Sequence, residues 1–251
     1  MYKKTILLAV ILAFSSTITS CRTLNSWSGQ DGQQYVFEKT HASIVRLEDP
    51  KTGGWGTGFF AMTKSGAKVI ITNAHICEIS LNAPIFLVYH RTKDFTNVRS
   101  AKPVKMLKKY ANSDLCIVSA PTDYDAPALP LADDVVIDAP IYIIGYPQIS
   151  ILSSSSGYVR GYAISDGGYP LPIEFCTDPK FHIVTFKSRE YCFLRIEAMF
   201  TDAPGDKGQS GSPGFNSDGE VIGVMSMIIG EYRSFSMLVP LSALKQFLLE
   251  N

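Results

Sequence analysis

The sequence lacks an excess of charge of either sign. Its 251 residues carry 23 lysines and arginines against 23 aspartates and glutamates. A near-neutral chain has no electrostatic attraction for nucleic acid or for an anionic membrane surface, so no nucleic-acid partner is expected. The sequence also contains no run of 18 consecutive apolar residues. A membrane-spanning helix, which needs roughly 20 such residues, is therefore not expected.

The spacing of cysteines and histidines does not resemble a zinc site. We expect neither a metal nor a cofactor. The chain shows no internal repeat, no heptad pattern and no low-complexity tract beyond residues 153–156. These absences argue against repeat and coiled-coil architectures. They leave an ordinary folded chain, long enough for one large all-β domain or two small ones.

The first twenty residues have the pattern of a secretory signal peptide. Lys3 and Lys4 precede an apolar run over residues 6–14, and small or polar residues follow up to position 20. The run is too short to span a bilayer. We therefore predict that residues 1–20 are removed on export. Their loss takes away two lysines and no acid, which leaves 21 basic against 23 acidic side chains and a net charge of −2.

The segment Ile18-Thr19-Ser20-Cys21 resembles the lipobox of bacterial lipoproteins. In that family the cysteine is diacylated and becomes the new N-terminus, and two or more acyl chains anchor a protein where one does not. The resemblance implies a membrane partner through a lipid on Cys21. Because Arg22 follows where Asp would resemble an inner-membrane retention signal, it implies the outer membrane or the periplasmic face in a Gram-negative cell, and the cell surface otherwise. Ordinary cleavage near Ser20, with Cys21 as a bystander thiol, stays open.

Many short apolar runs, broken by Gly, Pro, Asn and Asp, follow the polar residues 22–34. Their length and their content of β-branched and aromatic residues predict strands. Several short strands with regular turn signals indicate a sandwich or a barrel. The predicted strands are Ser43–Leu47, Gly58–Ala61, Val69–Thr72, Ile85–Tyr89, Cys116–Ser119, Ile141–Gly145, Tyr158–Ile164, His182–Phe186, Val221–Met227 and Phe235–Val239.

The end of the chain predicts one helix, over residues 241–249. Leu241, Leu244 and Leu248 fall on one helical face, and Pro240 stands where a helix-start signal belongs. Proline and acidic residues gather between positions 121 and 138 as in a linker. We expect a lipid-anchored flexible tether over 21–34, an N-terminal unit over 35–125 and a C-terminal unit over 126–251 that includes the helix.

Four cysteines remain after Cys21. An even number in an exported chain predicts disulfides. Three pairings are possible, and a hairpin between Cys176 and Cys192 would favour that pair, whose closed loop contributes about 3 kcal/mol in the chain-entropy model. The alternative of buried free thiols stays open. The other two cysteines are Cys77 and Cys116.

Three polar residues occur in contexts that suit nucleophilic catalysis. Ser210 lies in Gly208-Gln209-Ser210-Gly211, a motif that is weak alone. His75 follows the apolar run 69–71 through a short turn, and Asp114 heads the apolar run 115–118. A nucleophilic serine needs a base within hydrogen-bond reach, and the base needs an orienting group. An α/β-hydrolase order is excluded because no histidine follows position 182.

These motifs together resemble the bacterial branch of the chymotrypsin-like serine peptidases. The resemblance covers roughly residues 40–250 and includes the order His, Asp, Ser. It implies an all-β fold of two six-stranded antiparallel β-barrels with a C-terminal α-helix. Motifs similar to the first barrel are 56–60, 72–75 and 114–118, and motifs similar to the second are 144–147, 205–213 and 219–224.

The resemblance implies a serine endopeptidase that acts on polypeptides through an acyl-enzyme. Ser210 would be the nucleophile, His75 the base and Asp114 the carboxylate that orients the base. The backbone N–H groups of Gly208 and Ser210 would form the oxyanion hole. Ser226 would hydrogen-bond the carboxylate of the triad.

Substrate-binding positions follow from the same resemblance. Met227 and Ile228 continue the strand of Ser226, along which an extended substrate would pair, and they indicate an apolar or partly blocked pocket. Pro204 stands where trypsin-like members carry Asp, so cleavage after Lys or Arg is not expected. Gln209 replaces the Asp that pairs with a freshly cut N-terminus in digestive members, so we expect a site assembled without propeptide cleavage.

Two other functions stay open on the sequence. The chain could keep the peptidase fold as a surface-anchored binding protein without useful turnover. It could instead be an esterase that uses the same triad. Reaction of Ser210 with an organophosphonate separates the first from an enzyme, and peptide against ester turnover separates the second.

Overall fold

The computed structural model describes residues 29–50, 53–78, 85–90, 102–110, 113–122, 124–148, 151–171, 176, 181–186, 189–229 and 235–251. The predicted signal peptide and the lipobox with Cys21 lie outside these ranges. Within them, no helix is both long and apolar enough to pass through a membrane. The same ranges contain no group of three or more His, Cys, Asp or Glu residues placed to hold a metal ion.

The first half of the chain forms a closed antiparallel barrel. Its strands pair in the order β1-β2-β3-β6-β5-β4. They are rich in β-branched and aromatic residues, and their inward side chains fill the barrel. Their bounds are β1 Ile44–Glu48, β2 Trp55–Met62, β3 Lys68–Thr72, β4 Ile85–His90, β5 Lys102–Tyr110 and β6 Leu115–Ser119.

The second half forms a seven-stranded barrel-like sheet in the order β13-β12-β11-β7-β8-β10-β9. A further pairing of β10 with β13 joins six of these strands into a ring, and β9 lies outside it. The predicted fold class is therefore confirmed, with one strand more than expected. The bounds are β7 Pro140–Gly145, β8 Ser153–Leu171, β9 Phe181–Phe186, β10 Arg189–Thr201, β11 Pro213–Phe215, β12 Val221–Ile229 and β13 Phe235–Pro240.

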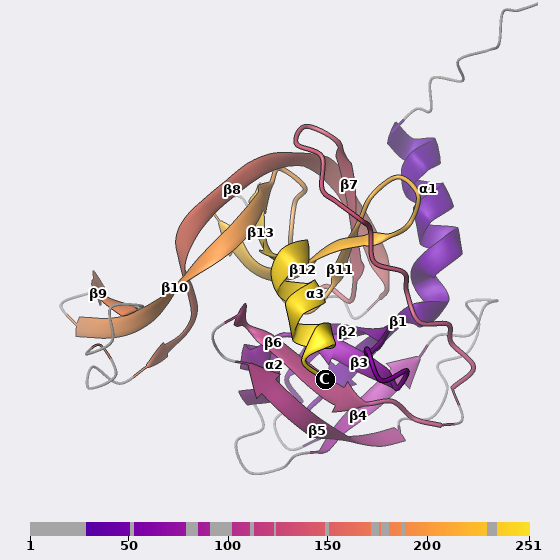
Figure 1. The fold of residues 1–251 in the computed structure, drawn as a ribbon, viewed down its shortest axis with the longest axis horizontal. Helices are drawn as coiled ribbons and strands as arrows, with labels where there is room; N and C mark the ends of the chain where they lie inside the picture. Colours follow the sequence, from indigo (N-terminus) through magenta and orange to yellow (C-terminus); the bar gives the residue numbers. More distant parts are fainter. Residues whose placement is uncertain are drawn as a thin grey trace, which may run out of the picture.

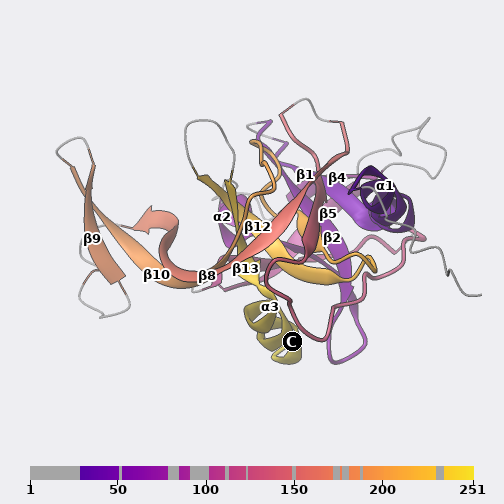
Figure 2. The ribbon, with the colours of Figure 1, turned by 90° about the horizontal axis from the view of Figure 1, so that it is seen from above.

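Strands β8 and β10 are longer than the barrel needs. They pair from Val159 opposite Thr201 out to Leu171 opposite Cys192. Figures 1 and 2 show that their far ends, together with β9, leave the body of the molecule as an arm. A disulfide between Cys176 and Cys192 closes this arm, which is the pairing that the hairpin argument favoured.

Two of the helices lie where the sequence predicted none. Helix α1 spans Gly29–Thr40 and leads through the 3₁₀ turn η1, His41–Ser43, into β1. It replaces the last part of the expected tether because it is bound to the second sheet: Val36 is fully buried, and Gln33 Nε2 donates to Ser154 O at 3.0 Å and to Ser154 Oγ at 2.8 Å. The single-turn helix α2 spans Ala74–Glu78.

Helix α3, Leu241–Leu249, is the helix predicted from its apolar face. Leu241, Leu244, Phe247 and Leu248 are buried on it. Figure 1 shows α3 running from the second sheet toward the first barrel, with the C-terminus beside that barrel. Lys64 N donates to Leu248 O at 3.2 Å and so fixes its end to the β2–β3 turn.

One buried cluster is shared by the two halves. It contains Phe59 and Ile71 of the first barrel, Phe215 and Val224 of the second sheet, and Phe247 of α3. Each half also has a cluster of its own. Because apolar burial contributes about 25 cal/mol per Å², the shared cluster opposes separation of the halves. Side chains from both halves can therefore be held in a fixed relation at the boundary.

Candidate active site

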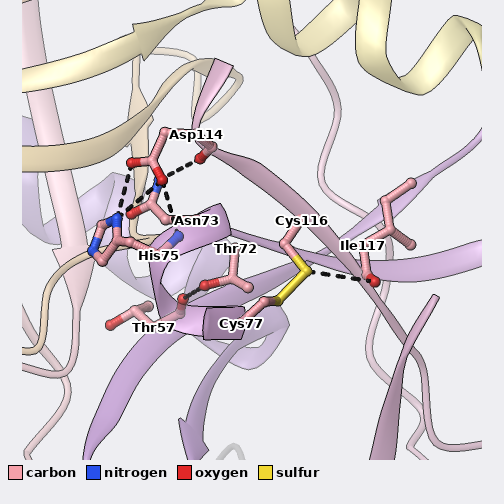
Figure 3. Close-up of a disulfide and its surroundings, with 8 residues drawn as sticks. All are labelled: Thr57, Thr72, Asn73, His75, Cys77, Asp114, Cys116 and Ile117. Atoms are coloured by element: carbon pink, nitrogen blue, oxygen red, sulfur yellow. Dashed lines mark hydrogen bonds and ion pairs between the residues drawn. A yellow bond between two sulfur atoms is a disulfide. The ribbon is translucent and has the colours of Figure 1, made fainter. Parts of the chain in front are cut away.

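His75 lies on α2, directly after strand β3. Its imidazole Nδ1 is 3.0 Å from both carboxylate oxygens of Asp114. Its backbone N–H also donates to Asp114 Oδ1 at 3.1 Å. The side chain is 23% exposed, so the ring is held on one edge by the carboxylate and only part of it is open to solvent. Figure 3 shows the two residues facing each other.

Asp114 stands at the head of β6 in an unusual backbone conformation. Its φ is 49°, in the left-handed region that residues other than glycine rarely adopt. Asn73 Nδ2 donates to Asp114 O at 3.0 Å and helps to hold that conformation. The side chain is only 2% exposed. A carboxylate so buried needs hydrogen-bond donors, and His75 supplies two of them.

Ser226 of β12 supplies a third donor from the other half of the molecule. Its Oγ donates to Asp114 Oδ2 at 2.5 Å. Ser210 lies beside it, on the turn before β11, and donates from Oγ to Ser226 O at 3.4 Å. That contact is longer than an ordinary O–H···O hydrogen bond and is therefore weak. The described residues include no hydrogen bond between Ser210 and the imidazole of His75.

The turn before Ser210 leaves two backbone donors without a protein acceptor. Gly208 has a φ of 89°. Glycine suits this position because a Cβ here would lie 2.5 Å from Tyr146 O and 2.6 Å from Trp55 Nε1. Across the described residues, the N–H groups of Gly208 and Ser210 donate to no protein acceptor. Two unsatisfied N–H groups beside a serine hydroxyl can receive an anionic oxygen.

Thr57, which sequence reasoning included only as part of a motif, ties this turn to the first barrel. Its N–H donates to Ser210 O at 2.8 Å, and its Oγ1 donates to Gly208 O at 2.9 Å. Oγ1 also accepts from Tyr146 N–H at 2.9 Å. Thr57 is fully buried. It fixes the turn from the side opposite to the solvent.

Gln209 explains how the turn stays ordered without an incoming charged group. Its side chain is 3% exposed, and its Oε1 accepts from Asp206 N–H at 2.8 Å. The backbone N–H of Gln209 in turn donates to Asp206 O at 3.1 Å. The two residues therefore close the turn on itself. Assembly of the site without propeptide cleavage stays a prediction.

The residues expected to bind substrate fall into two groups. Met227 and Ile228 are half-buried on β12, next to Ser226. Pro204 is exposed, whereas its neighbour Gly205 is buried. A Cβ on Gly205 would lie 2.3 Å from Met225 Cε and 3.2 Å from Ile228 Cγ1. The chain before Ser210 therefore packs through Gly205 directly on apolar side chains of β12.

An ion pair fixes the start of the loop 202–212, which leads from β10 to β11 and carries Ser210. Arg160 Nη2 contacts Asp202 Oδ2 at 2.5 Å, and Tyr158 N–H donates to Asp202 Oδ1 at 2.6 Å. Desolvation acts to raise the pKa of Asp202, but these hydrogen bonds outweigh it and lower the pKa below its ordinary value. The pKa of Arg160 is raised by its hydrogen bonds to Asp202 and Asp138. Asp202 is therefore held as a carboxylate.

Of the other histidines, His41 is part of the core. It is 8% exposed, and its Nδ1 lies 3.0 Å from both Phe37 O and Glu38 O. These contacts hold the ring against α1. It takes no part in the cluster of His75, Asp114, Ser210 and Ser226.

The class of protein is shown by a comparison of the sequence with models of known families. The chain matches the model of the trypsin-like peptidase domain over residues 56–224, which is more than half of its length. The protein therefore belongs to the trypsin-like peptidase domain family. The matched range includes His75, Asp114 and Ser210. A comparison with the sequences of curated proteins gives no significant match.

Solved structures of proteases share the fold. The Rv3671c protease in its inactive form aligns with a TM-score of 0.62 at 17% identity, over 84% of this chain and 89% of that one. Deg5 aligns with a TM-score of 0.62 at 20% identity, over 86% and 92%. The serine endoprotease from Yersinia pestis aligns with a TM-score of 0.59 at 15% identity, over 87% and 67%. At these identities the likeness concerns the fold.

Proposed function

We propose that the protein is a serine endopeptidase whose triad is His75, Asp114 and Ser210. The observation that carries the proposal is the hydrogen-bonded array at the boundary of the two halves. It places a buried carboxylate against Nδ1 of an imidazole and a serine hydroxyl beside two unpaired N–H groups. Family membership supports peptide-bond hydrolysis as the reaction.

In the proposed reaction Ser210 Oγ attacks the scissile carbonyl carbon and forms a tetrahedral intermediate. His75 Nε2 takes the hydroxyl proton and gives it to the leaving amine, which yields an acyl-enzyme. Water then attacks the acyl-enzyme by the same route in reverse. Asp114 holds the imidazole in the tautomer with Nδ1 protonated and stabilises the imidazolium that forms. Ser226, through its hydrogen bond to Asp114 Oδ2, keeps the carboxylate in place.

The oxyanion hole is assigned to the N–H groups of Gly208 and Ser210. One such donor contributes about 3–4 kcal/mol to stabilisation of the transition state. Thr57 supports them because it fixes the carbonyl groups of both residues. The donors are therefore oriented before substrate arrives, which is the condition for strong electrostatic stabilisation.

Ser210 must leave its contact with Ser226 O before it reacts. At 3.4 Å this contact is weak, so rotation about one side-chain bond toward His75 costs little. Catalytic hydrogen bonds are often long before substrate is bound and shorten in the complex. The resting position of the hydroxyl is thus compatible with an enzyme. A hydroxyl that never turned toward His75 would instead leave a binding protein, so the test below includes that outcome.

The test compares purified residues 22–251 with the Ser210→Ala variant on a mixed peptide library, read by mass spectrometry. Removal of the nucleophile should lower kcat by roughly 10⁶-fold. A fluorophosphonate probe should label the parent protein at Ser210 and leave the variant unlabelled. Cleavage of small esters without peptides would assign an esterase. A folded parent that neither cleaves nor reacts would assign a binding protein.

We also propose that the residue before the cleaved bond is small and apolar. The support is that the side chains of Met225 and Ile228 pack tightly against Gly205, five residues before Ser210. No acidic side chain stands at Pro204 to bind a lysine or an arginine. The cleavage sites in the same library provide the measurement. A dominant cut after Lys, Arg or a large aromatic residue would contradict this specificity.

We further propose that Cys21 carries a lipid that anchors the exported protein to a bacterial membrane. The support is the lipobox-like sequence 18–21 behind a signal-peptide pattern. In a Gram-negative host the site would be the outer membrane or its periplasmic face, and otherwise the cell surface. Cys21→Ala should move the protein from the membrane fraction to the soluble fraction. Unchanged partition, in a strain that exports both forms, would contradict the anchor.

A further inference from the structure

The two cysteines of the first barrel stand at the same offset from two residues of the site. Cys77 follows His75 by two positions, and Cys116 follows Asp114 by two positions. The structure joins them in a disulfide with Cα atoms 6.6 Å apart. Figure 3 shows this cross-link beside the contacts of His75 with Asp114. It connects the two elements that carry the imidazole and the carboxylate.

Helix α2 has little stability of its own. It contains five residues, whereas isolated helices shorter than about 12 residues are marginal in water. Its position therefore depends on contacts with the barrel. The side chain of Ile76 packs against Gly56, where a Cβ would lie 2.7 Å from Ile76 Cδ1. Helix α2 also contacts β5 and β8, and its contacts with the head of β6 include the covalent one.

The head of β6 is the firmer of the two partners. Cys116 is fully buried, and it pairs with Thr72 of β3 on one side and with Lys109 of β5 on the other. Asp114, two residues before it, is held in its left-handed conformation by these surroundings. A covalent bond from Cys116 therefore transmits the position of a central barrel strand to α2.

The contacts between His75 and Asp114 need this precision. Both carboxylate oxygens lie 3.0 Å from Nδ1, and one also accepts the backbone N–H of His75. A small sideways or axial shift of α2 would break this shared geometry. A misplacement of about 1 Å at an active site can cost roughly 10²-fold in rate.

We infer that the Cys77–Cys116 disulfide is a positioning device that holds α2 on the head of β6 and so holds the His75 imidazole against Asp114. The consequence for catalysis rests on the proposed function, but the consequence for the His75–Asp114 hydrogen bond does not. The sulfur atoms touch neither substrate nor the reacting atoms. They act through His75.

The chain offers a matched control. The second disulfide, Cys176–Cys192, lies on the arm of β8 and β10 and closes a shorter loop, with a sequence separation of 16 against 39. The chain-entropy effect of a cross-link grows only with the logarithm of loop length, so the two bonds constrain the unfolded chain comparably. Loss of either bond lowers stability, but only one of them borders His75 and Asp114.

The experiment compares Cys77→Ala/Cys116→Ala with Cys176→Ala/Cys192→Ala, both as residues 22–251. We expect the first variant to lose about 10- to 100-fold in kcat with KM changed less than about threefold. The control should keep kcat within about twofold of the parent. Equal kcat in the two variants, with circular dichroism confirming that both are folded, would overturn the inference.

A second readout does not depend on turnover. In protein labelled with ¹⁵N-histidine, the NMR signals of His75, assigned with a His75→Gln variant, report which ring nitrogen carries the proton. The parent and the control should show His75 protonated at Nδ1 and bonded to Asp114. The Cys77→Ala/Cys116→Ala variant should lose this signal or show a mixture of tautomers. An unchanged signal would refute the inference even if the parent cleaves no peptide.

If the alanine variant does not fold, reduction replaces it. Dithiothreitol is added to the folded Cys176→Ala/Cys192→Ala protein, in which only Cys77–Cys116 among these pairs remains to be reduced. The tautomer signal of His75 should disappear on reduction and return on reoxidation. A reduced, folded protein that keeps the signal would overturn the inference.

Discussion

The replacement Gly208→Ala tests the proposed oxyanion hole. A new Cβ would lie 2.5 Å from Tyr146 O, a backbone atom, and 2.6 Å from Trp55 Nε1. The carbonyl of Tyr146 is fixed because it accepts from Trp55 Nε1 at 3.3 Å and belongs to a buried segment. The backbone at Gly208 must therefore move, and its N–H turns away from the hole.

Gly208→Ala should have two separate effects, one on stability and one on kcat. A residue with a Cβ at positive φ costs about 1–2 kcal/mol in stability. The displaced donor costs about 10²–10³-fold in kcat. Gly66→Ala isolates the first part, because Gly66 has a φ of 81° and no atom within 4 Å of its Cβ position. Gly66 lies in the β2–β3 turn, away from the proposed hole.

The assay measures unfolding by guanidinium and steady-state hydrolysis of a peptide taken from the library cleavage sites. Both alanine variants should unfold at a lower denaturant concentration than the parent. Only Gly208→Ala should lose kcat, by about 10²-fold or more. If Gly208→Ala keeps kcat within threefold of Gly66→Ala, the N–H of Gly208 is not an oxyanion donor and the assignment is refuted.

Three further changes test the surroundings of the site. Ser226→Ala removes one donor from the buried Asp114 carboxylate, so kcat/KM should fall about tenfold, which corresponds to about 1.4 kcal/mol. An unchanged kcat/KM would exclude a role for Ser226 in holding Asp114. Thr57→Val leaves Gly208 O and Tyr146 N–H without their partner, so the free energy of unfolding should fall by about 1–3 kcal/mol and kcat should fall as well. Unchanged stability and kcat would show that Thr57 does not hold the turn of Ser210. Asp202→Asn should lower stability at pH 7, and the difference should shrink as the pH falls toward 3. The pKa of Asp202 is lowered in the folded state, so its contribution is present above the unfolded pKa and is lost as the pH falls through the folded one. A difference that is constant from pH 7 to pH 3 would exclude this linkage.

Motifs with a local physical cause were readable from the sequence. All ten predicted strands overlap strands of the structure, and α3 spans the residues that its apolar face indicated. A half-buried strand needs alternating apolar residues and a fully buried one a continuous apolar run, and both patterns can be seen in a short stretch of sequence. His75 and Asp114 were predicted as site residues for a similar reason, because each adjoins an apolar strand.

Elements that depend on tertiary contacts were missed. Helix α1 is polar along much of its length, and it forms on the second sheet through Val36 and Gln33. Strand β5, Lys102–Tyr110, contains four lysines and a proline, yet it pairs in the barrel between β4 and β6. Local propensity argues against both elements, and packing overrides it.

The site itself shows the same division. The proposed roles of Ser210 and Gly208 follow from a short motif, but the contacts of Thr57 with that motif could not be predicted. Thr57 is 153 residues from Ser210 in the sequence, and only the packing of β2 against the second half brings its N–H to Ser210 O. The pairing of Cys77 with Cys116 has the same origin, because three pairings were open until β6 was placed beside β3.

These long-range contacts share one consequence. Ser226 bonds Asp114, Thr57 bonds the turn of Ser210, and the shared apolar cluster lies beneath both contacts. The proposed nucleophile and its base therefore stand on different halves, and their separation is set by the packing of one half on the other. Substitutions that loosen this packing, such as Phe215→Ala in the shared cluster, should lower kcat at temperatures below those that unfold the chain. Loss of activity and loss of structure at the same temperature would show that the halves do not separate before they unfold.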